Sequence, residues 1–129
     1  MTKTVTRWKR EHEFISEMEE NTIELDGNRI NGFGPKALLL SGLAGCTGID
    51  VVDILEKMRV MFSSFEIEVE AEQTDEHPKV YKEIIITYRI ATIQENEDKV
   101  KKAIELSLDK YCGVAAMLRK IHQLVINWI

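Results

Sequence analysis

The stretch from Gly32 to Val60 constrains the fold more than any other part of the chain. It opens at a Gly-Pro step, which is followed over residues 37–43 by a run that is apolar on nearly every side. A helix that is hydrophobic all round must be buried, so we expect this stretch to lie at the centre of the fold. Small residues then surround a single thiol, Cys46, and we expect them to break the helix near Gly45 and Gly48.

Short β-favouring runs flank this helical stretch. Three of them precede it, at Thr4–Trp8, Phe14–Met18 and Thr22–Leu25, and they predict a small antiparallel meander that closes at an Asp-Gly turn. Two more follow it, at Phe65–Glu72 and Val80–Ile90, and predict a second sheet. The first of these two alternates apolar residues with glutamates, as a strand with one buried face and one solvated face does.

The last third of the chain predicts two helices and a final strand. Asn96 is placed to cap the first helix, and Gly113 is expected to end it in the left-handed conformation. The apolar stripe of that helix contains Val100, Ala103, Ile104, Leu108 and Tyr111. A short helix over residues 114–121 comes next, and a strand-like run over residues 124–129 ends the chain. The side chains that the short helix should bury are Met117, Leu118 and Ile121.

The order of these elements predicts an α+β fold, with an N-terminal β-meander and a second β-sheet around two central helices. A chain of 129 residues is long enough to bury a core as one domain, so we expect a single domain over residues 1–129. The three short strands of the meander have little of their own chain to pack against. We therefore expect a homodimer, in which a partner chain completes that sheet.

Charge and composition argue against several classes of function. The formal net charge is −5 and no basic patch is present, which argues against nucleic-acid binding. The uncharged run between Lys36 and Asp50 is shorter than the roughly 20 residues of a membrane span. The N-terminus lacks the apolar region of a secretory signal, so we expect a cytoplasmic protein with no membrane partner. The three histidines are widely scattered and show no zinc-site spacing, so we expect no metal.

Two cysteines in such a chain are expected to be free, catalytic or redox-sensing thiols in a reducing compartment. Cys46 and Cys112 each follow a helical run and are expected to lie at the start of a new helix. Unpaired N–H groups and the helix dipole at such a position lower a thiol pKa and favour the reactive thiolate. Asp50, one turn after Cys46, would act in the opposite direction if it faced the sulfur. A packing role remains the alternative, because free cysteine is among the residues most often buried.

Three segments of the chain resemble the OsmC/Ohr family, whose members are small thiol proteins that include organic hydroperoxide reductases and osmotically inducible proteins. These segments are GPKALLLSGLAGCTGIDVVDIL, EHPKVYKEIIITYRI and AIELSLDKYCGVAAML. Within the family, the chain is most similar to the uncharacterised OsmC-like branch. The resemblance implies the OsmC/Ohr α+β fold and an intertwined homodimer with two active sites at the subunit interface.

The resemblance also implies a peroxiredoxin-like, two-cysteine mechanism in the oxidative stress response. Cys46 would be the peroxidatic thiolate, and Cys112 would resolve its sulfenic acid by forming an intramolecular disulfide. The substrate would be an organic hydroperoxide and the reductant a small dithiol of the lipoyl type. No metal or organic cofactor would be needed for this chemistry.

The chain departs from the hydroperoxide reductases at one position. Those enzymes activate the thiolate with an N-terminal arginine, which is held by a glutamate just after the loop proline. Here Lys36 follows Pro35, so that glutamate is missing. The candidates for thiolate activation are therefore Arg10 as the arginine, His12 as the histidine found in the OsmC-like branch, and Lys36 as a positive charge. An exposed strand position is the competing interpretation of His12.

The missing glutamate leaves two other functions open. One is a non-catalytic dimer that binds a small hydrophobic ligand or senses redox stress. The other is a structural or stress-associated protein whose cysteines serve only to pack. Retention of both cysteines favours the peroxidase over these two, because packing would need only one of them.

Overall fold

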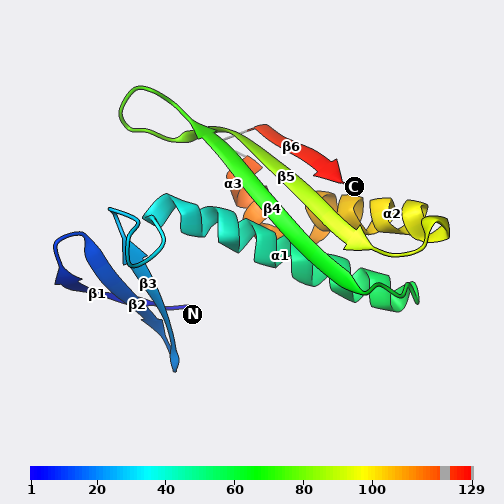
Figure 1. Ribbon diagram of the computed structural model, residues 1–129, viewed down its shortest axis with the longest axis horizontal. Helices are drawn as coiled ribbons and strands as arrows, with labels where there is room; N and C mark the ends of the chain where they lie inside the picture. The colour runs from blue at the N-terminus through cyan, green and yellow to red at the C-terminus, as the bar shows by residue number, and fades with distance from the viewer. Residues whose placement is uncertain (120–122, 129) are drawn as a thin grey trace. The chain divides into compact units, whose positions relative to one another are not determined.

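The computed structural model describes residues 1–119 and 123–128 (Figure 1). By its internal contacts the chain divides into two compact units, Met1–Leu39 and Leu40–Ile129. Each unit contains a three-stranded sheet, and the helices complete a mixed α+β architecture. The predicted fold class is thereby confirmed, whereas the single domain over residues 1–129 stays a prediction.

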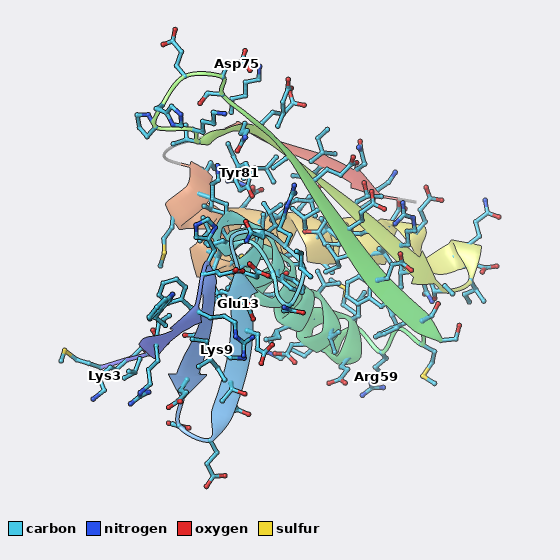
Figure 2. All side chains as sticks on the ribbon, turned by 60° about the vertical axis from the view of Figure 1, so that its left-hand side comes forward. Lys3, Lys9, Glu13, Arg59, Asp75 and Tyr81 are labelled. Carbon is cyan, nitrogen blue, oxygen red and sulfur yellow. The ribbon has the colours of Figure 1, made fainter. Side chains whose placement is uncertain are left out.

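The first unit contains the predicted antiparallel meander. Strands β1 (Val5–Arg10), β2 (Glu13–Met18) and β3 (Asn21–Asp26) pair in chain order. Figure 2 labels Lys9 and Glu13 on this sheet, and the Lys9 ammonium pairs with Glu24 across it at 3.4 Å. The alternation of β-favouring residues was therefore sufficient to predict all three strands.

Asp26 organises the loop that follows β3. Its side chain is buried, and its two carboxylate oxygens accept three backbone N–H groups of the loop, from Asn28 at 2.8 Å, Asn31 at 3.0 Å and Ile30 at 3.2 Å. The N–H groups of Asn31 and Asn28 are the largest causes that lower the pKa of this carboxyl group, since they stabilise its charged form. The loop geometry thus depends on an ionised Asp26.

Helix α1 (Pro35–Lys57) runs without interruption for 23 residues, so the predicted break near Gly45 and Gly48 is wrong. A glycine inside a helix costs only about 1 kcal/mol, whereas burial of a large apolar side chain contributes about 1.5–3 kcal/mol. The buried residues of α1 are Leu43, Thr47, Val51 and Leu55, and together they outweigh the glycine cost. Gly48 also has a packing role, because a Cβ there would lie 3.1 Å from Cδ1 of Ile67.

The second sheet joins β4 (Ser64–Gln73), β5 (Tyr81–Ala91) and β6 (Gln123–Trp128), with β5 in the middle. Strand β4 is antiparallel to β5, and β6 is parallel to it. Asp75 marks the loop that connects β4 and β5 (Figure 2). These strands confirm the predicted second sheet and the strand near the end of the chain, although Ile129 lies outside the described residues.

The exposed face of β4 carries the predicted row of glutamates. Arg89 on β5 lies between two of them, with Nη1 at 3.3 Å from Glu66 and 3.1 Å from Glu68. Lys82 pairs with Glu72 at 3.3 Å. The acidic face is therefore solvated, as predicted, and part of its charge is balanced by cations of the neighbouring strand.

The hydrophobic core of the second unit lies where α1, β5 and helix α2 (Glu97–Leu106) meet. The main core residues are Leu43, Val51, Leu55, Ile84, Ile86, Tyr88, Val100, Ala103, Ile104 and Leu108. The predicted cap of α2 is wrong, because the Asn96 side chain makes no capping bond and donates to Thr92 Oγ1 at 3.0 Å instead. A one-turn 3₁₀ helix, η1 (Gln94–Asn96), precedes α2 and changes the geometry at its start.

A π-helical turn, η2 (Ser107–Tyr111), follows α2 and leads through Cys112 to helix α3 (Gly113–Arg119). A π turn contains more residues than an α turn, so it shifts which side chains face the core. Tyr111 is accordingly exposed, although the stripe predicted that it would be buried. Gly113 has no positive φ and begins α3 instead of ending a helix, so its predicted role is wrong.

The short helix α3 agrees with the prediction in position but only in part in its packing. Leu118 is buried as predicted, whereas Met117 is 68% exposed. Ile121 lies outside the described residues. Because α3 has only two turns, one face of it is enough to cover the end of the core.

Helix α1 is also the one helix in the described part of the chain that is long and apolar enough to cross a membrane, by length and composition alone. The central helix of a globular core has the same properties, and one face of α1 packs into the core. The absence of a membrane partner stays a prediction.

Candidate functional site

The fold brings the two cysteines together from distant parts of the chain. Cys46 is half-buried in the middle of α1, and Cys112 is buried between η2 and α3. Both thiols are free, and a hydrogen bond joins their side chains. This bond raises the pKa of Cys112, because it favours the protonated form of that thiol.

Burial is the largest cause that raises the pKa of Cys112, followed by the bond to Cys46. The backbone N–H of Ala115 donates to the Cys112 sulfur at 3.4 Å and acts in the opposite direction. Together these effects raise the pKa of Cys112 from 9.0 to about 11. Cys112 does precede a helix, as predicted, but the expected thiolate is wrong because desolvation outweighs the single N–H donor.

The predicted environment of Cys46 is also wrong. Cys46 was expected at the start of a helix, but α1 is continuous on both sides of it. Unpaired N–H groups occur in the first turn of a helix, so α1 itself offers none to the Cys46 sulfur. Any activation of Cys46 therefore depends on groups outside α1, of which the Cys112 thiol is one.

Next to the cysteines lies a chain of buried hydroxyl groups. The Thr47 hydroxyl lies 2.8 Å from the Tyr88 hydroxyl and 2.7 Å from the Ser107 hydroxyl, and Ser107 donates to Oδ2 of Asp50 at 3.0 Å. Each hydroxyl has one proton to donate, and an ionised carboxylate only accepts. The protons are therefore ordered along the chain, from Tyr88 to Thr47, from Thr47 to Ser107 and from Ser107 to Asp50.

This hydroxyl chain connects α1, β5 and η2. The Tyr88, Thr47 and Ser107 side chains are fully buried, and burial raises the pKa of Tyr88 to about 12. The backbone oxygen of Ser107 also accepts the N–H of Cys112 at 2.7 Å. The hydroxyl chain thus fixes the turn that carries Cys112 relative to the helix that carries Cys46.

Sequence reasoning missed the hydroxyl chain, although the sequence contains a signal for it. Ser107 occupies a position of the apolar stripe of α2, three residues after Ile104. Thr47 lies between Leu43 and Val51 on the buried face of α1 at the same helical spacing. Polar residues on a buried stripe need hydrogen-bond partners, so the two positions could have been predicted to meet.

The three candidates for thiolate activation all belong to the unit Met1–Leu39. Arg10 pairs with Glu13 at 3.1 Å, and Nδ1 of the exposed His12 lies 3.2 Å from Oδ1 of Asn28. Lys36 lies in the first turn of α1. Their action on Cys46 stays a prediction.

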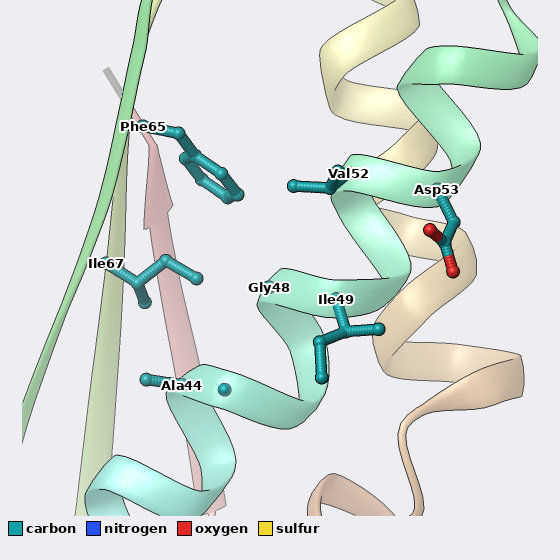
Figure 3. Close-up of a pocket in the computed structure, with 8 residues that line it drawn as sticks. Ala44, Gly48, Ile49, Val52, Asp53, Phe65 and Ile67 are labelled. Atoms are coloured by element: carbon teal, nitrogen blue, oxygen red, sulfur yellow. The ribbon is translucent and has the colours of Figure 1, made fainter.

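Two cavities that are lined by described residues of the second unit bear on function. The larger, of about 520 Å³, is an open groove between α1 and β4, across which Phe65 and Ile67 face Val52 and Gly48 (Figure 3). Its lining is apolar except for Asp53. The smaller cavity, of about 280 Å³, reaches Cys112. Within residues 1–119 and 123–128, no group of three or more His, Cys, Asp or Glu side chains is placed to hold a metal ion.

Comparison with known protein families assigns the chain to one of them. The model of a family described as OsmC-like protein matches residues 26–126, which is more than half of the chain. The chain belongs to the OsmC-like protein family. The resemblance predicted from the three sequence segments is confirmed, and membership of the OsmC-like family indicates a redox or peroxide-related function.

Individual relatives agree with this assignment. Protein YhfA of Escherichia coli K12 is 31% identical over 116 residues, which are 88% of this chain and 87% of YhfA. A hypothetical protein from Aquifex aeolicus VF5 has the same fold, with 29% identity, a TM-score of 0.89 and coverage of 100% of this chain and 95% of that chain. The organic hydroperoxide resistance protein OhrB of Bacillus subtilis shares the fold at 16% identity, with a TM-score of 0.68 and coverage of 100% and 98%.

Proposed function

We propose that this OsmC-like protein reduces organic hydroperoxides with Cys46 as the peroxidatic residue and Cys112 as the resolving residue. The observation that carries the proposal is the hydrogen bond between the two free thiols. Side chains in this contact need little movement to form a bond between their sulfur atoms.

The proposed reaction has two oxidative steps. The Cys46 thiolate attacks the distal oxygen of the peroxide, which leaves a sulfenic acid on Cys46 and releases the alcohol after protonation. The Cys112 sulfur then attacks the Cys46 sulfur, and its proton leaves with the hydroxyl group as water. A small dithiol reduces the resulting disulfide, and no metal or organic cofactor takes part.

The hydrogen bond between Cys112 and Cys46 also supports the proposal, because it bears on how the Cys46 thiolate is stabilised. A thiol that remains protonated at neutral pH, because its pKa is raised, can donate to a neighbouring thiolate and stabilise it. This donor would partly make up for the missing glutamate, which holds the activating arginine in the hydroperoxide reductases. Arg10, His12 and Lys36 remain proposed as residues that activate the Cys46 thiolate. We also propose the cytoplasm as the location, since a reducing compartment keeps both thiols free.

We propose a homodimer on the evidence of the first sheet. Directly paired residues share a face of a sheet, so the pairs Trp8–Phe14 and Phe14–Leu25 lie on one face, together with Ile23. Trp8 and Ile23 are 65% and 53% exposed within one chain. A second copy that covers this apolar face would remove it from water, as the family resemblance implies.

The decisive test is the consumption of cumene hydroperoxide with a dithiol reductant by the wild type, Cys46→Ser and Cys112→Ser. We expect turnover in the wild type, none in Cys46→Ser, and a single oxidation without recycling in Cys112→Ser. Mass spectrometry should show an intramolecular Cys46–Cys112 disulfide after peroxide treatment. A wild type with reduced thiols that neither consumes the peroxide nor forms this bond would overturn the proposal.

A second candidate function is the binding of a small hydrophobic ligand without catalysis. The groove between α1 and β4 favours it, because its volume and apolar lining are those of ligand pockets, whose volumes are roughly 300–1,000 Å³. A fatty acid or another apolar ligand would then raise the melting temperature of the wild type by mass action. Gly48→Leu, which fills the groove beside Ile67, should abolish that rise, and a rise that persists in this variant would contradict binding at the groove.

A further inference from the structure

The smaller cavity borders Cys112 but not Cys46. Its lining consists of Leu108, Asp109, Lys110, Cys112, Ala116 and Arg119. Cys46 is absent from this lining, although the two sulfurs are in contact. A molecule in the cavity would therefore lie against Cys112 and not against Cys46.

The charges around this cavity favour an anionic ligand. Lys110 and Arg119 contribute two positive charges and Asp109 one negative charge, which leaves one positive charge in excess. The Arg119–Asp109 pair is long, at 3.7 Å, and both side chains are substantially exposed. Such a pair contributes only about 0–1 kcal/mol, so Arg119 can exchange Asp109 for a carboxylate of a ligand at little cost.

The volume of about 280 Å³ limits the size of the ligand. It lies at the lower end of the roughly 300–1,000 Å³ that small-molecule sites occupy. A short chain with a thiol at one end and a carboxylate at the other matches both the volume and the distribution of charge. The thiol would lie beside Cys112, and the carboxylate would lie beside Arg119 and Lys110.

We propose that this cavity is the entry site of a small anionic dithiol, which reduces the Cys46–Cys112 disulfide by attacking the Cys112 sulfur. This inference rests on the proposed function, and it adds the site of entry, the charge of the reductant and the sulfur that it attacks.

Each step of the reduction balances. One thiolate of the dithiol attacks the Cys112 sulfur, the bond between the protein sulfurs breaks, and Cys46 leaves as a thiolate. The second thiol of the ligand loses its proton and attacks the ligand sulfur of the mixed disulfide, which releases Cys112. Cys112 takes up a proton, and the ligand leaves as a cyclic disulfide, so two electrons pass from the dithiol to the protein.

The chemistry of Cys112 supports this direction of attack. Attack on the Cys46 sulfur would expel Cys112, and a thiol leaves more slowly when its pKa is high. The pKa of Cys112 is raised mainly by burial, which opposes the formation of its thiolate as a leaving group. Attack on Cys112 through the cavity avoids that step, because Cys46 is expelled instead.

The first test identifies the attacked sulfur. The wild type is oxidised with diamide, so that the disulfide forms without a peroxide, and is then treated briefly with the anionic monothiol thioglycolate. After quenching with acid and labelling with N-ethylmaleimide, peptide mass spectrometry locates the two adducts. We expect thioglycolate on Cys112 and maleimide on Cys46. The reverse distribution would overturn the proposal.

The second test examines the charge. The rate of reduction of the diamide-formed disulfide is compared for dihydrolipoate, which is anionic, and dihydrolipoamide, its neutral counterpart. In Arg119→Gln we expect the preference for dihydrolipoate to fall roughly two- to fivefold, the range of an exposed ion pair. Arg89→Gln, which alters an exposed arginine on β5, is the matched control and should leave the preference unchanged. An unchanged preference in Arg119→Gln would contradict the anionic site.

These tests separate the inference from the proposed function. If peroxide is not consumed but the diamide-formed disulfide is reduced through Cys112, the peroxidase proposal fails and the entry site stands. If the peroxidase assay succeeds but thioglycolate appears on Cys46, the entry site fails alone. If neither oxidant joins the two cysteines, both proposals fail.

Discussion

The ordered protons of the hydroxyl chain predict a ranking of three substitutions. Tyr88 only donates, Thr47 accepts from Tyr88 and donates to Ser107, and Ser107 accepts from Thr47 and donates to Asp50. Removal of a hydroxyl at the start of the chain should therefore cost less stability than removal of one in the middle. The substitutions are Tyr88→Phe, Thr47→Val and Ser107→Ala, each of which removes a hydroxyl with little change in shape.

The magnitudes follow from the bonds that each substitution removes. Tyr88→Phe removes one neutral hydrogen bond and leaves no unpaired donor, so it should lower the free energy of unfolding by about 0.5–1.5 kcal/mol. Thr47→Val removes two bonds and leaves the buried Tyr88 hydroxyl without an acceptor, which should cost about 2–3 kcal/mol. Ser107→Ala removes a neutral bond and a bond to a carboxylate, which together should cost about 2–4 kcal/mol.

Urea unfolding followed by circular dichroism at pH 7 measures these differences. Ser41→Ala, an exposed serine on the same helix as Thr47, is the matched control and should change stability by less than about 0.5 kcal/mol. If Tyr88→Phe costs as much as Thr47→Val, the proton order is wrong. If Ser107→Ala costs no more than the control, the hydroxyl chain does not stabilise the turn before Cys112.

Three further predictions concern other parts of the molecule. Folding lowers the pKa of Asp26, so its stabilising contribution is present above its ordinary pKa of 3.8 and is lost as the pH falls through the lower pKa of the folded state. Melting curves at falling pH should show this loss of stability in the wild type and much less of it in Asp26→Asn. Because the pKa of Cys112 is raised to about 11, iodoacetamide at pH 8 should alkylate Cys46 first by peptide mass spectrometry, and equal rates would contradict the raised pKa of Cys112. Trp8→Glu should shift the mass from light scattering toward the monomer, while Thr22→Glu on the opposite face should not; a monomeric wild type would contradict the dimer.

The sequence predicted the elements that follow a simple period. The strands around Ile67 and Ile86 alternate with period two, and α2 carries its apolar residues at helical spacing, so local pattern and burial agree. Predictions failed where packing overrode local preference. Gly45 and Gly48 would weaken an isolated helix, but burial of one face of α1 keeps it continuous, and the environment of Cys46 changes accordingly.

The site could be predicted only in part. The pairing of Cys46 with Cys112 came from the family resemblance, since nothing in their local sequence shows that they meet. The raised pKa of Cys112 depends on burial by distant elements, which a helix-start argument does not include. Thr47 and Ser107 were visible as polar residues on buried stripes, but their contact with each other depends on how α1 packs against the end of α2.

Because Ser107–Tyr111 forms a π turn, the direction of the Cys112 side chain depends more on the number of residues before it than on their identity. Successive residues of a helix differ in direction by about 100°, so an extra residue in one turn redirects every side chain after it by roughly that angle. Here the shift turns Tyr111 to solvent and Cys112 to the core. A relative that is one residue shorter in this segment could keep both cysteines and still lack the contact between them. The number of residues in this turn is therefore a criterion for separating relatives whose two cysteines are in contact from relatives that have both cysteines without the contact.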